Sequence, residues 1–133
     1  MSVFIDTSAL FALLDASDVR HRQAARIWAG LLDSDADLFT HSYVIVETSA
    51  LVQRRMGEKL LEPLFDGLLP LVRIIWVEEE IHRRALAVFR SLRMSSLSLV
   101  DCVSFEVMRQ KGGERAFAFD RHFEEQGFKV LKA

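Results

Sequence analysis

The sequence predicts an α/β fold in which a central parallel sheet is covered by helices in a three-layer α/β/α arrangement. Short apolar runs of strand length alternate with longer amphipathic stretches along the chain, a pattern typical of strand–helix–strand units. Half of the 133 residues are hydrophobic and ten are Phe, so the chain can bury a sizeable core. No repeat, low-complexity tract or Pro/Gly/Ser-rich linker interrupts it, and we therefore expect residues 1–133 to form a single domain.

The first half of the chain is expected to supply two strands and three helices. The strands are short apolar runs, and the helices show apolar residues at helical spacing. In order they are strand Val3–Ile5, helix Ala9–Leu14, helix Arg20–Leu32, strand Leu38–Thr40, and a helix that runs from a Ser42 cap to Arg55 and stops near Gly57.

The second half is expected to supply three strands between four helical segments. Val72–Val77 is rich in β-branched residues, which favours a strand, and Ser98 with Asp101 forms a capping-box pattern that starts a helix. In order the elements are helix Glu58–Leu69, strand Val72–Val77, helix Ile81–Leu92, a loop at Ser95–Leu97, the helix from Ser98 to Gly112, strand Ala116–Phe119, a turn with a short helix over Asp120–Gln126, and strand Phe128–Leu131.

Composition and charge exclude several classes of function. The formal net charge is −2, whereas a protein that holds duplex DNA by charge alone should be clearly basic. The only cysteine, Cys102, has no internal partner for a disulfide, and the N-terminus lacks the features of a signal peptide. The longest apolar runs, such as Leu68–Val72, are too short to cross a bilayer, so we expect a cytoplasmic protein that does not bind membranes.

Two acidic residues are expected to meet because each directly follows a predicted strand. Asp6 follows Val3–Ile5, and Asp120 follows Ala116–Phe119. In a parallel sheet the carboxyl ends of all strands lie along one edge, which is where open α/β folds bind ligands. More than a hundred residues of sequence therefore separate two carboxylates that the fold should bring to one edge.

Two further acids lie on helices that begin at the same edge. Glu47 lies among apolar residues, with Val44 and Leu51 at helical spacing from it, and an acid on an apolar face needs a partner or a metal. Asp101 lies in the first turn of its helix, where the helix dipole favours the charged form. Each acid taken alone could be an ordinary helix cap or turn residue, and only their shared edge favours a common site.

The four carboxylates together predict a site for a hard divalent cation. Four like charges repel one another, and a divalent ion removes that conflict. Oxygen donors suit Mg²⁺ or Mn²⁺, and no His/Cys spacing indicates zinc. Such an ion can lower the pKa of water and stabilise charge on a phosphodiester, and it lets a mildly acidic chain meet a polyanion.

The same residues carry a resemblance to the PIN-domain family and, within it, to the VapC-type toxin ribonucleases of bacterial type II toxin–antitoxin systems. Four segments in the family's order, spread over nearly the whole chain, make the resemblance specific. They are Val3–Leu10, Val44–Thr48, Leu97–Phe105 and Ala118–Phe123.

The resemblance implies a central parallel sheet and Mg²⁺- or Mn²⁺-dependent cleavage of single-stranded RNA. It also implies a homodimer and a small antitoxin partner that blocks the site. Residue by residue, the family's acids fall on Asp6, Glu47, Asp101 and Asp120, and its small polar position falls on Ser8. Some members carry a fifth acid two residues after the fourth, but here that position is His122.

The expected mechanism is hydrolysis by metal-activated water, with Asp6 and Asp101 as primary metal ligands and Glu47 and Asp120 completing the shell or holding water. Arg121 and His122 are candidate phosphate ligands because they directly follow Asp120. Arg54 and Arg55, like the basic run Arg20–Arg22, are expected on exposed helix faces. His41 is expected to be structural, and Cys102 a small buried residue rather than a thiol nucleophile. Part of an apolar segment is expected to face a second copy or an antitoxin, with ordinary core burial as the alternative; its residues are Leu60, Leu61, Leu64, Phe65, Leu68 and Leu69.

Two alternatives of other classes remain open at this stage. A phosphotransfer enzyme of the haloacid-dehalogenase type also has an Asp after its first strand, but it needs a second Asp two residues later, where this chain has Ser8. A non-catalytic interaction module with the PIN fold is the other alternative. The intact set of four acids counts against it.

Overall fold

The computed structural model describes residues 1–93 and 95–133. Its centre is a sheet of five parallel strands in the order β3-β2-β1-β4-β5. The strands are β1 (Ser2–Ile5), β2 (Asp37–His41), β3 (Arg73–Ile75), β4 (Arg115–Phe117) and β5 (Lys129–Val130). All pairings are parallel, so every strand ends at the same edge of the sheet, as the strand–helix alternation predicts.

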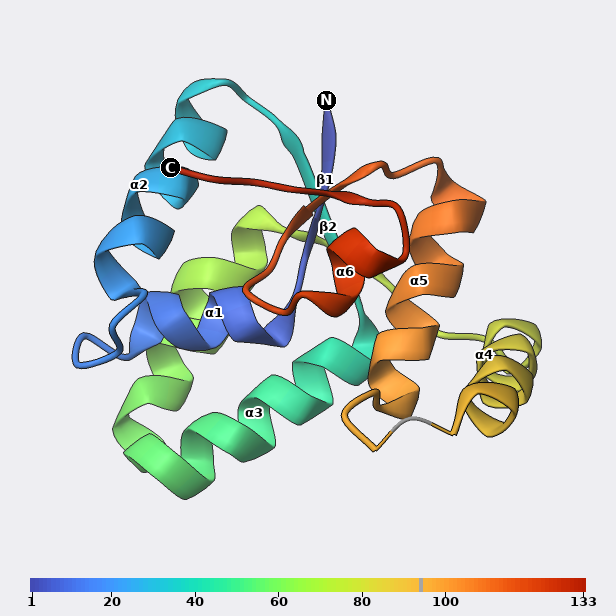
Figure 1. Cartoon of the computed structure of the whole chain (residues 1–133). Coiled ribbons are helices and arrows are strands. Elements are labelled where there is room, and N and C mark those ends of the chain that lie inside the picture. The colour runs from blue at the N-terminus through green and yellow to red at the C-terminus, as the bar shows by residue number, and fades with distance from the viewer. Residues whose placement is uncertain (94) are drawn as a thin grey trace.

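Helices cover both faces of this sheet, which confirms the predicted fold class (Figure 1). They are α1 (Thr7–Leu14), α2 (His21–Asp33), α3 (Ser42–Met56), α4 (Glu79–Leu92), α5 (Leu99–Lys111) and the short α6 (His122–Glu125). From β1 through β2 to β3 the chain adds strands toward one edge of the sheet. It then returns to the centre and places β4 on the other side of β1. Right-handed crossovers therefore place α1, α2 and α3 on one side and α4 and α5 on the other.

The core lies between the sheet and these helices and is built around aromatic side chains. Phe4 in the central strand contacts the rings of Phe39 and Phe123, with centroids 5.6 Å and 5.9 Å away, and all three side chains are fully buried. Fully burying an aromatic side chain stabilises the fold by about 1.5–3 kcal/mol. This packing fixes the positions of the central strands, and with them the loops at their carboxyl ends.

The segment predicted as one α-helix over Glu58–Leu69 is wound differently. It consists of a 3₁₀ turn η1 (Glu58–Leu60), a π-helical segment η2 (Pro63–Leu68) and a second 3₁₀ turn η3 (Leu69–Leu71). Pro63 has no N–H to continue an α-helical ladder, and the Leu69 N–H bonds the carbonyl of Leu64 five residues back. The prediction of a regular α-helix was wrong, and the segment contains two prolines, Pro63 in η2 and Pro70 in η3, which each remove an N–H from an α-helical ladder.

Several element ends also differ from the sequence prediction, and two of them show which contacts set an end. The helix α3 is capped by the side chain of His41 rather than Ser42, whose hydroxyl instead accepts the N–H of Val77 at 2.9 Å. Strand β4 ends at Phe117 rather than Phe119, because its partner β1 turns into α1 after Ile5. Among the described residues, no helix combines the length and the apolar character needed to cross a membrane.

Candidate active site

The four predicted acids line one pocket at the carboxyl ends of the strands. The pocket has a volume of about 450 Å³ and opens between α1, α3 and the start of α5. Its lining residues are Asp6, Thr7, Ser8, Glu47, Ala50, Leu51, Arg54, Ser98, Asp101 and Asp120. The fold therefore brings together all four carboxylates from segments as far apart in sequence as residues 6 and 120.

Asp6 is held at the turn from β1 into α1 by Ser8. One carboxylate oxygen of Asp6 accepts the Ser8 N–H at 3.1 Å and the Ser8 hydroxyl at 2.6 Å, so Asp6 is also the N-cap of α1. The same Ser8 hydroxyl oxygen accepts the N–H of Phe119 at 2.9 Å. Ser8 thus ties Asp6 to the loop that carries Asp120.

Asp101 and Asp120 are likewise fixed by backbone N–H groups at the starts of helices. Ser98 and Asp101 form a reciprocal capping box at α5, as predicted, with both hydrogen bonds 3.0 Å long. Asp120 accepts the N–H of His122 at 2.9 Å in the turn before α6. Asp101 and Asp120 therefore each lie at the start of a helix and also line the pocket. A role as a helix cap does not exclude a role in a functional site.

Glu47 reaches the pocket from the second turn of α3 and is half-buried. Its helix is joined to α1 by a buried hydrogen bond of 3.0 Å in which the Thr48 hydroxyl donates to the hydroxyl of Thr7. A side-chain hydrogen bond from Thr7 in turn favours the charged form of Glu47. Neither threonine was singled out in the sequence, because a buried hydroxyl has no distinctive pattern.

A buried link below the pocket joins the two helices that carry Glu47 and Asp101. The Nδ1 atom of His41 accepts the N–H groups of Tyr43 and Val44 at the start of α3. Its Nε2 atom donates to the hydroxyl of Ser104 at 2.8 Å, and Ser104 donates to the carbonyl of Val100 in α5. His41 is fully buried, which confirms that it is structural.

Burial and mutual repulsion make the charged carboxylates costly in this pocket. The pKa of Asp6 is raised to about 7, mainly by burial and further by the charges of Asp101 and Glu47, although Ser8 opposes the shift. The pKa values of Glu47 and Asp101 are also raised, in both cases first by burial and then by neighbouring acids of the same cluster. The pocket therefore concentrates negative charge, and the hydrogen bonds from Ser8, Thr7 and Ser98 offset only part of its cost.

The acids line the pocket wall rather than converge on one point. Within residues 1–93 and 95–133, no group of three or more His, Cys, Asp or Glu side chains is arranged to hold a metal ion as it stands. Three of the four carboxylates, those of Asp6, Asp101 and Asp120, accept hydrogen bonds from the backbone N–H groups of Ser8, Ser98 and His122.

The basic residues near the pocket differ from expectation. His122 is buried, with Nδ1 3.0 Å from Glu125 and Nε2 3.2 Å from the carbonyl of Ser96. Both ring nitrogens are engaged, so the expectation that His122 binds phosphate is not supported and its ring acts as a tether. Arg121 is exposed next to Asp120. Arg54, expected only on an exposed helix face, also lines the acid pocket.

Cys102 does not supply a nucleophile. Its side chain is only 2 % exposed, and burial raises the pKa of its thiol, with the nearby charge of Asp101 adding to the shift. A buried thiol held in its neutral form is a poor nucleophile, as the sequence interpretation expected.

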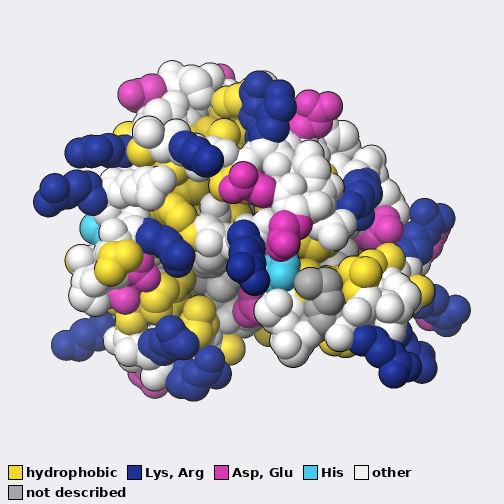
Figure 2. All heavy atoms as spheres, in the orientation of Figure 1, with side chains coloured by type: hydrophobic (Ala, Val, Ile, Leu, Met, Phe, Trp, Pro, Cys, Tyr) yellow, Lys and Arg dark blue, Asp and Glu magenta, His cyan; other side chains and the backbone are white. Residues whose placement is uncertain are grey.

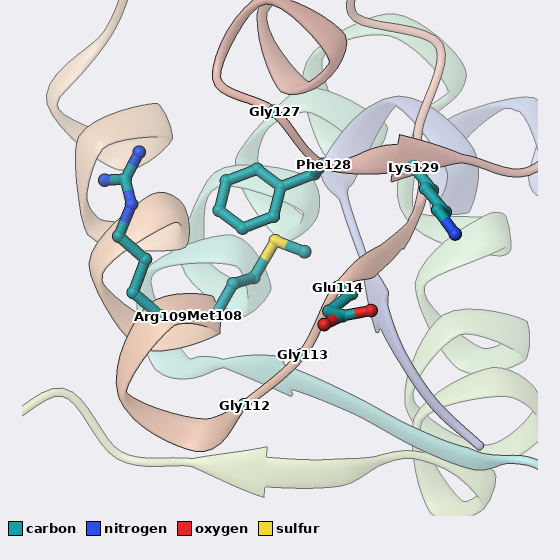
Figure 3. A pocket seen from close by; sticks show the side chains of 8 residues that line it. All are labelled: Met108, Arg109, Gly112, Gly113, Glu114, Gly127, Phe128 and Lys129. Carbon is teal, nitrogen blue, oxygen red and sulfur yellow. The ribbon is translucent and has the colours of Figure 1, made fainter.

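A larger cavity, of about 510 Å³, lies at the opposite end of the sheet (Figure 3). It is formed where α5 ends and β4 and β5 begin, and its residues are Met108, Arg109, Gly112, Gly113, Glu114, Gly127, Phe128 and Lys129. Arg109 donates to Gln126 at 2.8 Å and lies 5.4 Å from the centroid of the Phe128 ring. We assign the site to the smaller acid pocket, because ligands of parallel α/β folds bind at the carboxyl ends of strands.

Comparison with known proteins gives a consistent assignment. The PIN domain family model matches residues 3–129. The chain is 35% identical over 127 residues to a Mycobacterium tuberculosis protein named 23S rRNA-specific endonuclease VapC20, covering 95% of each chain. It is 25% identical to a VapC ribonuclease of Archaeoglobus fulgidus, covering 92% of this chain and 80% of that protein.

Solved structures agree with these relatives. The crystal structure of M. tuberculosis VapC20, described as a sarcin–ricin loop cleaving toxin, matches with a TM-score of 0.83 and 33% identity over 98% of this chain and 99% of that chain. VapBC2 from Rickettsia felis, solved with a promoter DNA fragment, matches in fold with a TM-score of 0.73, 12% identity and 98% of each chain covered. From the family match and the full-length similarity to VapC20, the chain belongs to the PIN-domain family and is of the VapC type.

Proposed function

We propose that this protein is a metal-dependent endoribonuclease that hydrolyses phosphodiester bonds in single-stranded RNA and acts as the toxin of a toxin–antitoxin pair. The observation that carries the proposal is that Asp6, Glu47, Asp101 and Asp120 line one pocket at the carboxyl edge of the sheet. The names of the VapC relatives support the same chemistry.

The residues present fit a hard divalent cation such as Mg²⁺ or Mn²⁺. The pocket offers carboxylate oxygens, and the raised pKa values of Asp6, Glu47 and Asp101 reflect burial and repulsion among like charges that a divalent ion would relieve. Mg²⁺ typically keeps several water ligands and binds protein through one or two carboxylates. Carboxylates spread around a pocket wall suit this type of coordination.

Asp6 and Asp101 would hold the ion directly, and Glu47 and Asp120 would complete its shell or hold water. When bound, the ion would supply a Lewis acid that lowers the pKa of water and offsets charge developing on the phosphate. Ser8 holds Asp6 and the loop of Asp120 in a fixed relation through its shared hydroxyl. Thr7 holds Glu47 through a hydrogen bond, and Arg121 supplies a cation at the edge of the pocket.

The target and partners are proposed from the relatives and from exposed apolar residues. Because VapC20 is named for 23S rRNA and the sarcin–ricin loop, we propose the same loop as the first substrate to test. Trp76 and Val46 are 71 % and 69 % exposed, and Phe65 of the apolar segment is 41 % exposed. Exposed apolar residues suit a homodimer and an antitoxin, and light scattering after size exclusion would establish the oligomeric state.

The proposal is tested by cleavage of an unstructured RNA, a sarcin–ricin loop RNA and DNA of matching sequence. We expect RNA cleavage with Mg²⁺ or Mn²⁺, its loss in EDTA, and no cleavage of the DNA, which lacks the 2′-hydroxyl. Absence of cleavage from every RNA in the presence of either ion would favour the non-catalytic interaction module instead. Release of phosphate from a small phosphomonoester without RNA cleavage would favour the phosphotransfer alternative.

A further inference from the structure

The acid pocket extends beyond the four carboxylates along α3, and a basic side chain lies at that end. Ala50, Leu51 and Arg54 line this part of the pocket. Arg54 follows Glu47 by seven residues, which is close to two helical turns, so both lie on one face about 10 Å apart along the axis. Helical side chains tilt toward the N-terminus, which inclines Arg54 toward the acids.

The side chain of Arg54 has no ion pair, hydrogen bond or ring contact with a residue that the structure describes, as is also true of Arg22, Arg26, Arg90, Arg115 and Arg121, but of these only Arg54 lines the acid pocket. Arg73 pairs with Asp37, and Arg83 and Arg84 pair with Glu79 and Glu80. The next residue, Arg55, lies over the ring of Phe11 at 5.8 Å. Arg54 forms no such ion pair, hydrogen bond or ring contact with the residues the structure describes, although it is exposed in a pocket rich in carboxylates.

A second hollow adjoins the acid pocket at Asp120. It has a volume of about 220 Å³ and shares Asp120 with the acid pocket. Its other lining residues are the basic Arg121 and Lys132, the acidic Glu124, the polar Gln23 and the apolar Ala118, Phe119, Val130 and Leu131. The four acids therefore line the first hollow together with Arg54, and Asp120 joins it to a second hollow that contains Arg121 and Lys132. Figure 2 shows that Lys and Arg side chains lie among Asp and Glu side chains on the face of the molecule in view.

We propose that these two hollows form one track for single-stranded RNA, in which Arg54 binds a backbone phosphate on one side of the reaction centre and Arg121 with Lys132 binds on the other. This inference rests on the proposed function, because it assigns the path of the strand through the same site. A chain with a net charge of −2 needs locally placed cations to hold a polyanion against its own acids. Arg suits this role since its planar guanidinium can bind two phosphate oxygens at once.

The contacts of Arg54 reach phosphate rather than base edges, so they should strengthen binding of any single-stranded sequence. The apolar wall of Ala50 and Leu51 offers a surface for sugar or base faces between the acids and Arg54. Such contacts position the strand and leave sequence choice to other residues.

The test measures binding separately from cleavage. A fluorescently labelled 12-nucleotide unstructured RNA is titrated with the Asp101→Asn protein, and with the same protein carrying Arg54→Ala, Arg54→Lys or Arg55→Ala, over a series of KCl concentrations. We expect Arg54→Ala to weaken binding about three- to tenfold and to reduce the slope of log K against log salt by about 0.7, the value for one phosphate contact on a single strand. Arg54→Lys should keep the slope, and Arg55→Ala, matched in charge loss but outside the pocket, should change neither quantity.

Equal affinity and salt slope for the Arg54→Ala protein and its parent would overturn the track, as would a parent that does not bind the RNA. Thermal melting of each variant excludes unfolding, and Arg54→Lys provides a second reading if the alanine variant is unstable. The two hypotheses fail differently. Loss of the Arg54 effect while the unmodified protein cleaves RNA overturns only the track, whereas RNA binding through Arg54 without any cleavage overturns only the nuclease.

Discussion

The two ends of the sheet carry cavities of similar size but different electrostatic state. At the amino ends of β4 and β5, the cavity of about 510 Å³ contains Arg109, whose guanidinium is already bonded to Gln126 and lies over Phe128. At the carboxyl ends, the smaller pocket of about 450 Å³ gathers four carboxylates whose charges repel one another. The clustering of like charges, and not the volume of the cavity, distinguishes the pocket that needs a ligand.

The amino-end cavity is also explained by packing. Gly112 has a φ of 72° and ends α5 in the left-handed conformation that favours glycine. A Cβ atom on Gly113 would lie 2.8 Å from the Phe39 ring, so glycine is needed there for close approach of the chain. These two glycines serve the packing of the fold, whereas the buried and mutually repelling carboxylates at the other end lower the stability of the folded state.

The largest expected effect contrasts one acid from each end. Asp101→Asn keeps the capping-box geometry but removes a proposed metal ligand, so we expect RNA cleavage to fall at least about a hundredfold. The matched control is Glu114→Gln, an equal change of charge in the amino-end cavity, which should cleave at the unmodified rate. Initial rates on the same RNA with Mg²⁺ measure both, and circular dichroism verifies folding. Full activity of Asp101→Asn would remove this residue from the site and break the contrast.

The next largest effect concerns how the free energy of unfolding depends on pH through the buried His41. Burial lowers the pKa of His41 from its ordinary 6.5 to about 3. Between these values the unfolded chain binds a proton that the folded chain excludes. The contribution of His41 is therefore complete above pH 6.5 and is lost as pH falls toward 3, by up to about 1.4 kcal/mol per pH unit.

His41→Asn should show a smaller loss of stability over this pH range, because Asn can still accept N–H groups at the cap but does not titrate. Urea unfolding at pH 7.0, 6.0 and 5.0 measures the slopes. The variant's stability at pH 7.0 will be lower, since the link to Ser104 is gone, so only the slope is diagnostic. Equal slopes in both proteins would contradict the buried, neutral state of His41.

The smallest expected effect is a gain in thermal stability when Asp6, an acid of the proposed site, is replaced by Asn. The pKa of Asp6 is raised to about 7, so between its ordinary value of 3.8 and 7 the folded chain retains a proton that the unfolded chain loses. The penalty grows as pH rises through this range and is complete above pH 7. In EDTA at pH 8, Asp6→Asn should therefore be more stable than the unmodified protein, with a Tm about 5 °C higher.

The gain in Tm should largely disappear near pH 4, because there the folded Asp6 keeps its proton and the unfolded chain, with an ordinary pKa of 3.8, loses it only in part. Added Mn²⁺ should raise the Tm of the unmodified protein and have less effect on Asp6→Asn, since binding to the native state stabilises it. Glu114→Gln serves again as the control, with no comparable gain. A lower Tm for Asp6→Asn in EDTA at pH 8 would show that Asp6 is held by its hydrogen bonds without a charge penalty.

Much of the architecture follows from local sequence patterns. The alternation of apolar runs and amphipathic stretches predicted the all-parallel sheet, and the Ser98–Asp101 capping box was found as predicted. That the four acids share one pocket also followed, because the edge of a parallel sheet is fixed by topology. Their roles as metal ligands stay a prediction.

Other features depended on contacts between distant segments. No local pattern shows that His41 caps α3 and reaches Ser104, 63 residues away, or that the Ser8 hydroxyl holds the loop before Asp120 across 111 residues. The sequence predicts His122 as a candidate phosphate ligand, whereas Glu125 and Ser96 engage both of its ring nitrogens. Arg54 lines the pocket only because α3 crosses beside α1.

The sequence by itself determined the order of elements and the acids at their ends, since hydrophobic periodicity and helix starts are encoded within a few residues. The tertiary structure alone decided which side chains are buried, how they are paired and how far their pKa values move. Burial, hydrogen bonding and desolvation depend on neighbours that lie tens of residues away in the chain.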